Sequence, residues 1–155
     1  MIIAEIGLNH NGDMNIARAL VAEAKAAGAD IAKFQFFDAS KYFPKDFEWM
    51  AACMDARLTF EQAKMLKNYC DELNIEFMAS AFDRQGLDWC LELGVKRLKL
   101  ASRCIEQTDL IEDMRATGLE LIVSLGMWNN VEFPEIFGNT PVHYLYCISK
   151  YPTEF

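Results

Sequence analysis

The sequence repeats one local pattern, in which an amphipathic helical segment ends at Gly or Asn and a short apolar strand follows. The pattern occurs in the stretches AAGADIAKFQF, ELNIEFMASAF, ELGVKRLKLAS and ATGLELIVSLG. Gly28, Asn74, Gly94 and Gly118 lie where a left-handed residue commonly closes a helix. Strands that alternate with helices pair in parallel through right-handed crossovers. The chain is therefore predicted to be an α/β protein, built as a doubly wound sheet or as a (β/α)8 TIM barrel.

The individual elements follow from hydrophobic periodicity and from capping residues. The clearest helix spans 59–73, where apolar residues recur on one face and Thr59 with Gln62 forms a capping box. Further helices are predicted at about 14–27, 84–93 and 108–117. Strands are predicted near 2–6, 31–36, 75–79, 97–101, 120–124 and 142–147. No full helix is expected between the last two strands, because Pro134 and Pro141 interrupt that connection.

The length and composition of the chain indicate its domain organisation and argue against some binding partners. The chain has 155 residues with no linker or repeat, so residues 1–155 are predicted to form one domain. A net charge of -8 argues against nucleic acid or an anionic membrane as partners, because both are polyanionic. The five cysteines are widely spaced without a C-x-x-C pair, and the chain has no long apolar run. A cytoplasmic location is expected.

Polar residues at the carboxyl ends of the strands are the candidate site residues, because function gathers there in both architectures. Serines lie near four of these ends: Ser80, Ser102, Ser124 and Ser149. Lys33 and Lys99 lie within strands that should be apolar, and a buried ammonium without a partner is costly. They are predicted to meet Glu5 of the first strand, or to share one pocket with a bound phosphate or carboxylate. A solvated rim lysine or a structural ion pair is the ordinary alternative.

The stretch NHNGD at 9–13 also has two interpretations. Asn and Gly tolerate positive φ, and Asp13 or Asn15 can cap the next helix, so an ordinary turn explains most of it. A turn does not explain Glu5 within the preceding strand. Asn9 and His10 are therefore kept as candidate substrate-binding residues.

Six motifs in order resemble the sialic acid (N-acetylneuraminate) synthase family. They are EIGLNHNGD from Glu5, KFQ from Lys33, SAFD from Ser80, KLAS from Lys99, SLGM from Ser124 and SKYPT from Ser149. The resemblance implies a (β/α)8 TIM barrel, of which this chain carries about six β/α units. It also implies condensation of phosphoenolpyruvate with an N-acylated amino sugar, such as N-acetylmannosamine or its 6-phosphate, with release of phosphate.

The resemblance further implies a role for each candidate residue. Lys33 and Lys99, with the four serines, would hold the phosphate and carboxylate of phosphoenolpyruvate. Gln35 would face the sugar, and Glu5 would handle a proton or stabilise charge near the reacting carbons. In the implied mechanism C3 of phosphoenolpyruvate attacks the sugar aldehyde, and a divalent metal, Mn²⁺ or Mg²⁺, polarises the aldehyde oxygen. Water then adds at C2, and phosphate leaves by C–O cleavage.

Two positions depart from the family pattern. Tyr146 stands where the family has a metal-ligating His, and phenol is a poor replacement for imidazole on Mn²⁺. Cys104 stands where the family usually has an acidic residue that contacts the sugar. The substrate is therefore expected to differ, or the metal to be absent.

Metal binding by this chain is predicted to be weak. Glu5 and Asp83 are the remaining oxygen ligands, while His10 and His143 are expected to lie too far apart to converge on one ion. Without substrate the chain should bind Mn²⁺ no tighter than about 0.1 mM, because few oxygen ligands hold such an ion weakly. Paramagnetic broadening measures this, and a stoichiometric micromolar site would contradict it.

The chain is too short for a closed barrel, because such a barrel needs eight strands and about 250 residues. The resemblance implies that two more β/α units follow Phe155. It also implies a small antifreeze-like domain that completes the sugar site across a homodimer. On its own, the chain is expected to self-associate or to be unstable, because its first and last strands have free edges and half-covered apolar surface.

Two other functions stay open. A desolvated Lys33 or Lys99 could form a Schiff base with a carbonyl substrate, as in lysine aldolases. Alternatively, the chain is a non-catalytic descendant that retains an anion site, which Tyr146 makes credible.

Overall fold

The computed structural model describes residues 1–150 and 153. These residues form six parallel strands that neighbour one another in chain order. The strands are β1 (Ile3–Gly7), β2 (Ile31–Phe36), β3 (Glu76–Ala81), β4 (Arg97–Leu100), β5 (Glu120–Ser124) and β6 (Val142–Leu145). A doubly wound sheet would reverse its strand order at a switch point, whereas this order is that of a barrel wall. The predicted TIM-barrel type with about six β/α units is confirmed.

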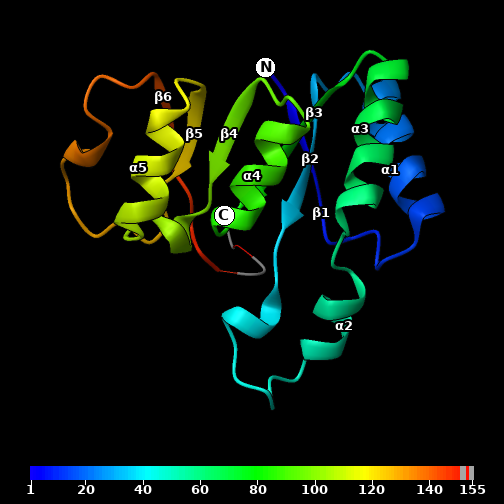
Figure 1. The fold of residues 1–155 in the computed structure, drawn as a ribbon, viewed down its shortest axis with the longest axis horizontal. Helices are drawn as coiled ribbons and strands as arrows, with labels where there is room; N and C mark the ends of the chain where they lie inside the picture. The colour runs from blue at the N-terminus through cyan, green and yellow to red at the C-terminus, as the bar shows by residue number, and fades with distance from the viewer. Residues whose placement is uncertain (151–152, 154–155) are drawn as a thin grey trace.

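Helices flank the curled sheet (Figure 1). They begin and end close to the predicted positions. They are α1 (Met14–Ala26), α3 (Phe60–Glu72), α4 (Arg84–Glu92) and α5 (Thr108–Ala116). The four predicted C-terminal residues all adopt positive φ: Gly28 at 86°, Asn74 at 53°, Gly94 at 65° and Gly118 at 71°. No helix among residues 1–150 and 153 has the length and apolar character needed to cross a membrane.

The capping box of α3 forms as predicted. Gln62 N donates to Thr59 Oγ1 at 3.2 Å, and Thr59 N donates to Gln62 Oε1 at 2.9 Å. Two of the backbone donors at the start of the helix are satisfied in this way.

Replacing Thr59 with Ala is expected to lower the free energy of unfolding by about 1 kcal/mol, because the first turn loses its hydroxyl acceptor. Urea unfolding of the two proteins measures this loss. Thr108→Ala is the matched control, since Thr108 opens α5 where no side-chain cap bond forms. If both variants lose the same stability, the capping bond does not contribute.

The connections contain structure that periodicity did not predict. A short helix, α2 (Met50–Asp55), and the 3-10 turn η1 (Ala39–Lys41) lie between β2 and α3. This segment projects past the carboxyl end of β2 (Figure 1). Between β5 and β6 the structure has only the 3-10 turn η3 (Glu135–Phe137), as the prolines predicted.

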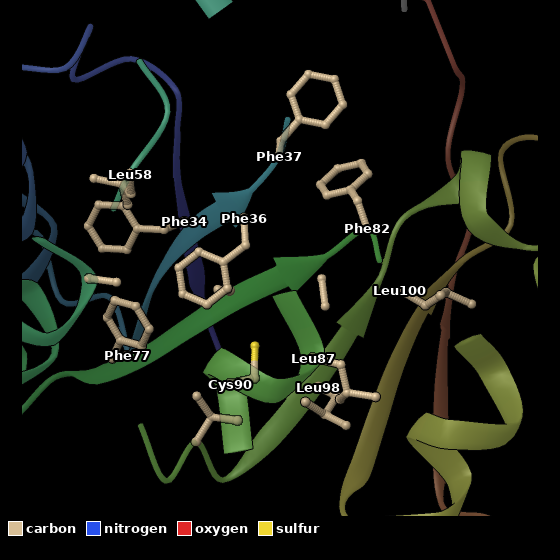
Figure 2. Packing of buried hydrophobic residues seen from close by; sticks show 14 of the residues in the cluster. Phe34, Phe36, Phe37, Leu58, Phe77, Phe82, Leu87, Cys90, Leu98 and Leu100 are labelled. Carbon is tan, nitrogen blue, oxygen red and sulfur yellow. The ribbon is translucent and has the colours of Figure 1, made fainter. Parts of the chain in front are cut away.

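The main core lies between the strands and the helices. Figure 2 shows the rings of Phe34 and Phe36 from β2 beside that of Phe77 from β3. Phe34 and Phe77 stack with their ring centroids 5.4 Å apart, and both are fully buried. Because alternate residues of a strand face opposite sides, this packing turns Lys33 and Gln35 to the other face of the sheet.

The inner face of the sheet has its own, smaller apolar layer. Ile31, Met78 and Ile122 form a buried cluster there, separate from the main core. Toward the amino ends of the strands, Arg97 pairs with Glu76 at 2.9 Å and with Glu120 at 3.5 Å. Toward the carboxyl ends, the same face carries the polar residues that the sequence singles out.

Candidate functional site

A cavity of about 540 Å³ opens at the carboxyl ends of the strands. It brings together eight of the ten candidate residues: Glu5, Lys33, Gln35, Ser80, Lys99, Ser102, Ser124 and Ser149. The register explains the convergence, because Glu5 pairs with Lys33 across β1 and β2, and Ser80 pairs with Lys99 across β3 and β4. The two lysines therefore line one pocket, as predicted.

Lys33 has a counter-charge within the protein. Its ammonium forms an ion pair with Glu5, and its Nζ lies 3.5 Å from Ser80 Oγ. Lys33 is only 8% exposed, so an unpaired charge at this position would be costly. About half of the Glu5 side chain is exposed, and it faces the cavity. One of the two counter-charges that the sequence required is thus Glu5.

Lys99 has no carboxylate partner within the described part of the chain. Its Nζ donates to Leu100 O at 2.6 Å and to Ser124 Oγ at 2.7 Å, and the residue is 4% exposed. Burial, together with the nearby charge of Lys33, lowers the pKa of Lys99 to about 8. Lys99 therefore holds a charge that neutral oxygens satisfy only in part, and an anion in the cavity would complete its shell.

The serines lie around the lysines, and two of them lie close to Gly126. Ser102 Oγ accepts a hydrogen bond from Gly126 N at 3.1 Å. A Cβ at Gly126 would lie 2.5 Å from Ser149 Oγ and 2.9 Å from Cys147 O. Only glycine leaves room for the segment after β6 to pack against the loop after β5, which brings Ser149 to the cavity.

Asn9 and His10 do not line the cavity. Asn9 Nδ2 donates to Ile6 O at 2.9 Å, and the residue is exposed on the turn. His10 is fully buried, with its ring 6.1 Å from that of Phe34 on the core side of the sheet. Its Nδ1 accepts a hydrogen bond from Gly12 N at 3.2 Å, and burial lowers its pKa. In the described structure these residues have the turn role and lie outside the cavity, and their part in substrate binding stays a prediction.

Several cavity residues were not singled out from the sequence. Most are apolar: Ile3, Phe82, Ala101, Met127, Leu145 and Ile148. Cys147 and Arg103 also line the cavity. Arg103 directly follows Ser102 of the KLAS motif, and a charged residue at that position was an available signal.

The residues considered as metal ligands do not come together. Asp83 caps α4 by accepting from Gly86 N at 2.9 Å, and it pairs with Lys41 instead of facing the cavity. Tyr146 is 90% exposed, and Cys104 is fully buried. No three His, Cys, Asp or Glu side chains within residues 1–150 and 153 are placed to hold an ion. The donor set described does not by itself fit a metal centre.

Fold and cavity together define an α/β barrel protein that gathers two buried lysines and four serines at the carboxyl ends of its strands. Residues 20–155 match the NeuB family, and the chain belongs to that family. The resemblance to sialic acid synthases is thereby confirmed.

Relatives of known name agree with this membership. The chain is 34% identical to the N,N'-diacetyllegionaminic acid synthase of Legionella pneumophila, covering 99% of this chain and 50% of the relative. It is 30% identical to the N-acetylneuraminate-9-phosphate synthase of Drosophila melanogaster, covering 99% and 46%. The crystal structure of an N-acetylneuraminic acid synthetase from Leptospira borgpetersenii, in complex with citrate, superposes with a TM-score of 0.93 at 35% identity, covering 99% and 55%. The chain spans about half the length of these proteins.

Proposed function

We propose that the protein condenses phosphoenolpyruvate with an N-acylated amino sugar, forming a C–C bond and releasing phosphate. The product would be a sialic-acid-type nonulosonate. The observation that carries the proposal is Lys99, a buried ammonium without a carboxylate partner in the described chain, in one cavity with Lys33 and four serines. Membership of the NeuB family supports the reaction class. The relatives are named for products with and without a phosphate, so membership alone leaves the sugar open.

The cavity residues suit the binding of phosphoenolpyruvate. Lys99 and the Ser124 hydroxyl lie 2.7 Å apart and would donate together to one anionic group of the substrate. Lys33 and Ser80 would donate to the other. In a partly buried site such contacts fix the orientation of the enol, so that C3 faces the aldehyde.

Glu5 is placed to move a proton in the reaction. As the new C–C bond forms, the aldehyde oxygen must gain a proton, and the water that adds at C2 must lose one. Glu5 lies beside Lys33 at the cavity, where its carboxylate could take the proton from this water. Cleavage of the C2–O bond then releases phosphate.

The test is phosphate release from phosphoenolpyruvate with a panel of N-acylated amino sugars, using the full-length gene product in ¹⁸O-labelled water. Release should require both substrates, and the label should enter the sugar product because the C–O bond breaks. Label in the phosphate would show hydrolysis at phosphorus and would overturn the proposal.

A Schiff-base aldolase is the second candidate, and one observation favours it. Because burial lowers the pKa of Lys99 to about 8, its amine is partly unprotonated near neutral pH and thus nucleophilic. Borohydride reduction with a carbonyl substrate would trap a covalent adduct on Lys99 if this mechanism operates. Full activity after borohydride treatment with substrate would exclude it.

Binding of phosphoenolpyruvate should weaken as pH rises through about 8, the pKa of Lys99. Below this pH Lys99 is cationic and attracts the anion, and above it the free protein has lost the charge. A phosphate monoester is already dianionic in this pH range, because its second pKa is about 6, so the charge of the ligand stays constant. Calorimetry should show affinity about tenfold lower at pH 9.5 than at pH 7.5. Lys99→Met should flatten the profile, and an unchanged slope in that variant would contradict the assignment.

A further inference from the structure

Arg103 is a third cation at the cavity, and neither the strand-end motifs nor the proposed binding of phosphoenolpyruvate uses it. It lies in the 3-10 turn η2 (Ser102–Cys104), directly after β4, and lines the same cavity as Lys99. Its residue is exposed, whereas Lys99 is buried. Arg103 therefore lies nearer the solvent side of the cavity than the lysine does.

The backbone at Arg103 is fixed on both sides. Cys104 N donates to Ala101 O at 2.9 Å, and Ile105 N donates to Ser102 O at 3.2 Å. Cys104 is fully buried, so the turn is anchored in the core directly beside Arg103. The side chain thus starts from a rigid position.

Two aromatic rings hold the guanidinium of Arg103. Its Cζ lies 5.2 Å from the ring centroid of Tyr42 and 5.0 Å from that of Phe43, both in the segment after β2. Tyr42 is itself fixed, because its hydroxyl donates to Phe82 O at 2.5 Å and its ring stacks on Phe37 at 5.4 Å. Contact with ring faces orients the guanidinium and leaves its edge N–H groups unused.

Among the residues that the structure describes, no carboxylate is paired with Arg103. Within residues 1–150 and 153 it has no ion pair and no hydrogen bond, whereas Lys33 is paired with Glu5. A preoriented guanidinium with free edges is suited to a phosphate or carboxylate, which it can bind through two parallel bonds.

We propose that Arg103 is a specificity-determining residue that binds an anionic group, phosphate or carboxylate, on the second substrate. This rests on the proposed function, in which phosphoenolpyruvate occupies the buried lysines. Cys104, the next residue, is fully buried and offers the sugar no charge. The charge offered to the sugar is thus positive, which selects an anionic N-acylated amino sugar over a neutral one.

The test compares three sugars by calorimetry on the same chain, with and without phosphoenolpyruvate. They are N-acetylmannosamine, its 6-phosphate and the corresponding 6-carboxylate. At least one anionic sugar should bind about tenfold or more tightly than the neutral sugar, as expected for one charge-assisted contact. Phosphate and carboxylate are distinguished by which of the two binds more tightly.

Arg103→Gln should abolish this preference, and Arg103→Lys should restore it in part, because lysine keeps the charge without the fork. Arg18→Gln is the matched control, since Arg18 also lies over a tyrosine ring, 3.9 Å from the centroid of Tyr69, but on the helical surface. The control should keep the full preference.

Binding of phosphoenolpyruvate separates this inference from the proposed function. Arg103→Gln should leave its affinity within about twofold of wild type, because Lys99 holds that ligand. If the variant loses as much affinity for phosphoenolpyruvate as for the anionic sugar, Arg103 binds the first substrate and the inference is wrong. It is also wrong if wild type shows no preference for an anionic sugar. If that preference is present but phosphoenolpyruvate does not bind, the proposed function fails and the anion site at Arg103 stands.

Discussion

Replacing Lys99 with Met is expected to weaken the binding of phosphoenolpyruvate by about 10- to 150-fold, since a charge-assisted contact is worth roughly 1.5 to 3 kcal/mol. The physical reason is the position of the ammonium. Lys99 is 4% exposed and bonded only to neutral oxygens in the described structure. A bound anion would therefore interact with the whole charge of the ammonium, in a site that is partly shielded from water. Titration calorimetry at pH 7, where most of Lys99 is protonated, measures the change.

Lys96→Met is the matched control. Lys96 precedes β4 and is exposed at the opposite end of the strands, so its loss removes the same charge without touching the cavity. It should change the affinity by less than about twofold, because exposed charges are screened. Equal affinities for Lys99→Met and wild type would refute the anion site, provided that thermal melting shows both proteins folded.

Replacing Gly12 with Ala is expected to destabilise the protein by more than about 4 kcal/mol, an exceptional loss for one methyl group. Gly12 has φ of 79°, and a Cβ there would lie 2.2 Å from the backbone carbonyl oxygen of Asp55. A backbone oxygen cannot rotate away as a side chain can, so the turn after β1 and the end of α2 would have to separate. Urea unfolding measures the loss.

Gly28→Ala separates the cost of a positive φ from the cost of the clash with Asp55. Gly28 has φ of 86° and no atom within 4 Å of its added Cβ, so its substitution tests the backbone conformation alone. A loss of about 1 to 2 kcal/mol is expected there. Equal losses at both glycines would mean that the contact between Gly12 and Asp55 is not tight in solution.

The fold was predictable because its signals are local and repeated. Left-handed residues such as Gly28 and Asn74 mark the helix ends, and the alternation of Phe34 with Lys33 assigns the two faces of β2. The choice between a barrel wall and a doubly wound sheet was not local, because strand order depends on contacts between distant segments. The motif resemblance was needed to favour the barrel.

Most of the polar residues of the candidate site were predicted, whereas its apolar lining was not, and the exceptions have physical causes. Lys33 and Lys99 could be identified because each is a charged residue within an otherwise apolar strand, which the sequence alone reveals. The burial of His10 depends on the ring of Phe34, which no pattern around residue 10 indicates. Arg103 was not singled out although it follows the KLAS motif, because its orientation depends on the rings of Tyr42 and Phe43, about 60 residues earlier in the chain.

The charged residues at the amino ends of the strands have a consequence for assembly. Glu76, Arg97 and Glu120 stand on three adjacent strands, so acid, base and acid alternate along the inner wall. His143 on β6 continues the row, with its Nε2 2.5 Å from Glu120. Exchanging β3 or β5 with an outer neighbour would break these pairs, and a shift of one residue would turn the partners to opposite faces. These ion pairs therefore favour the observed strand order and register over alternative pairings during folding.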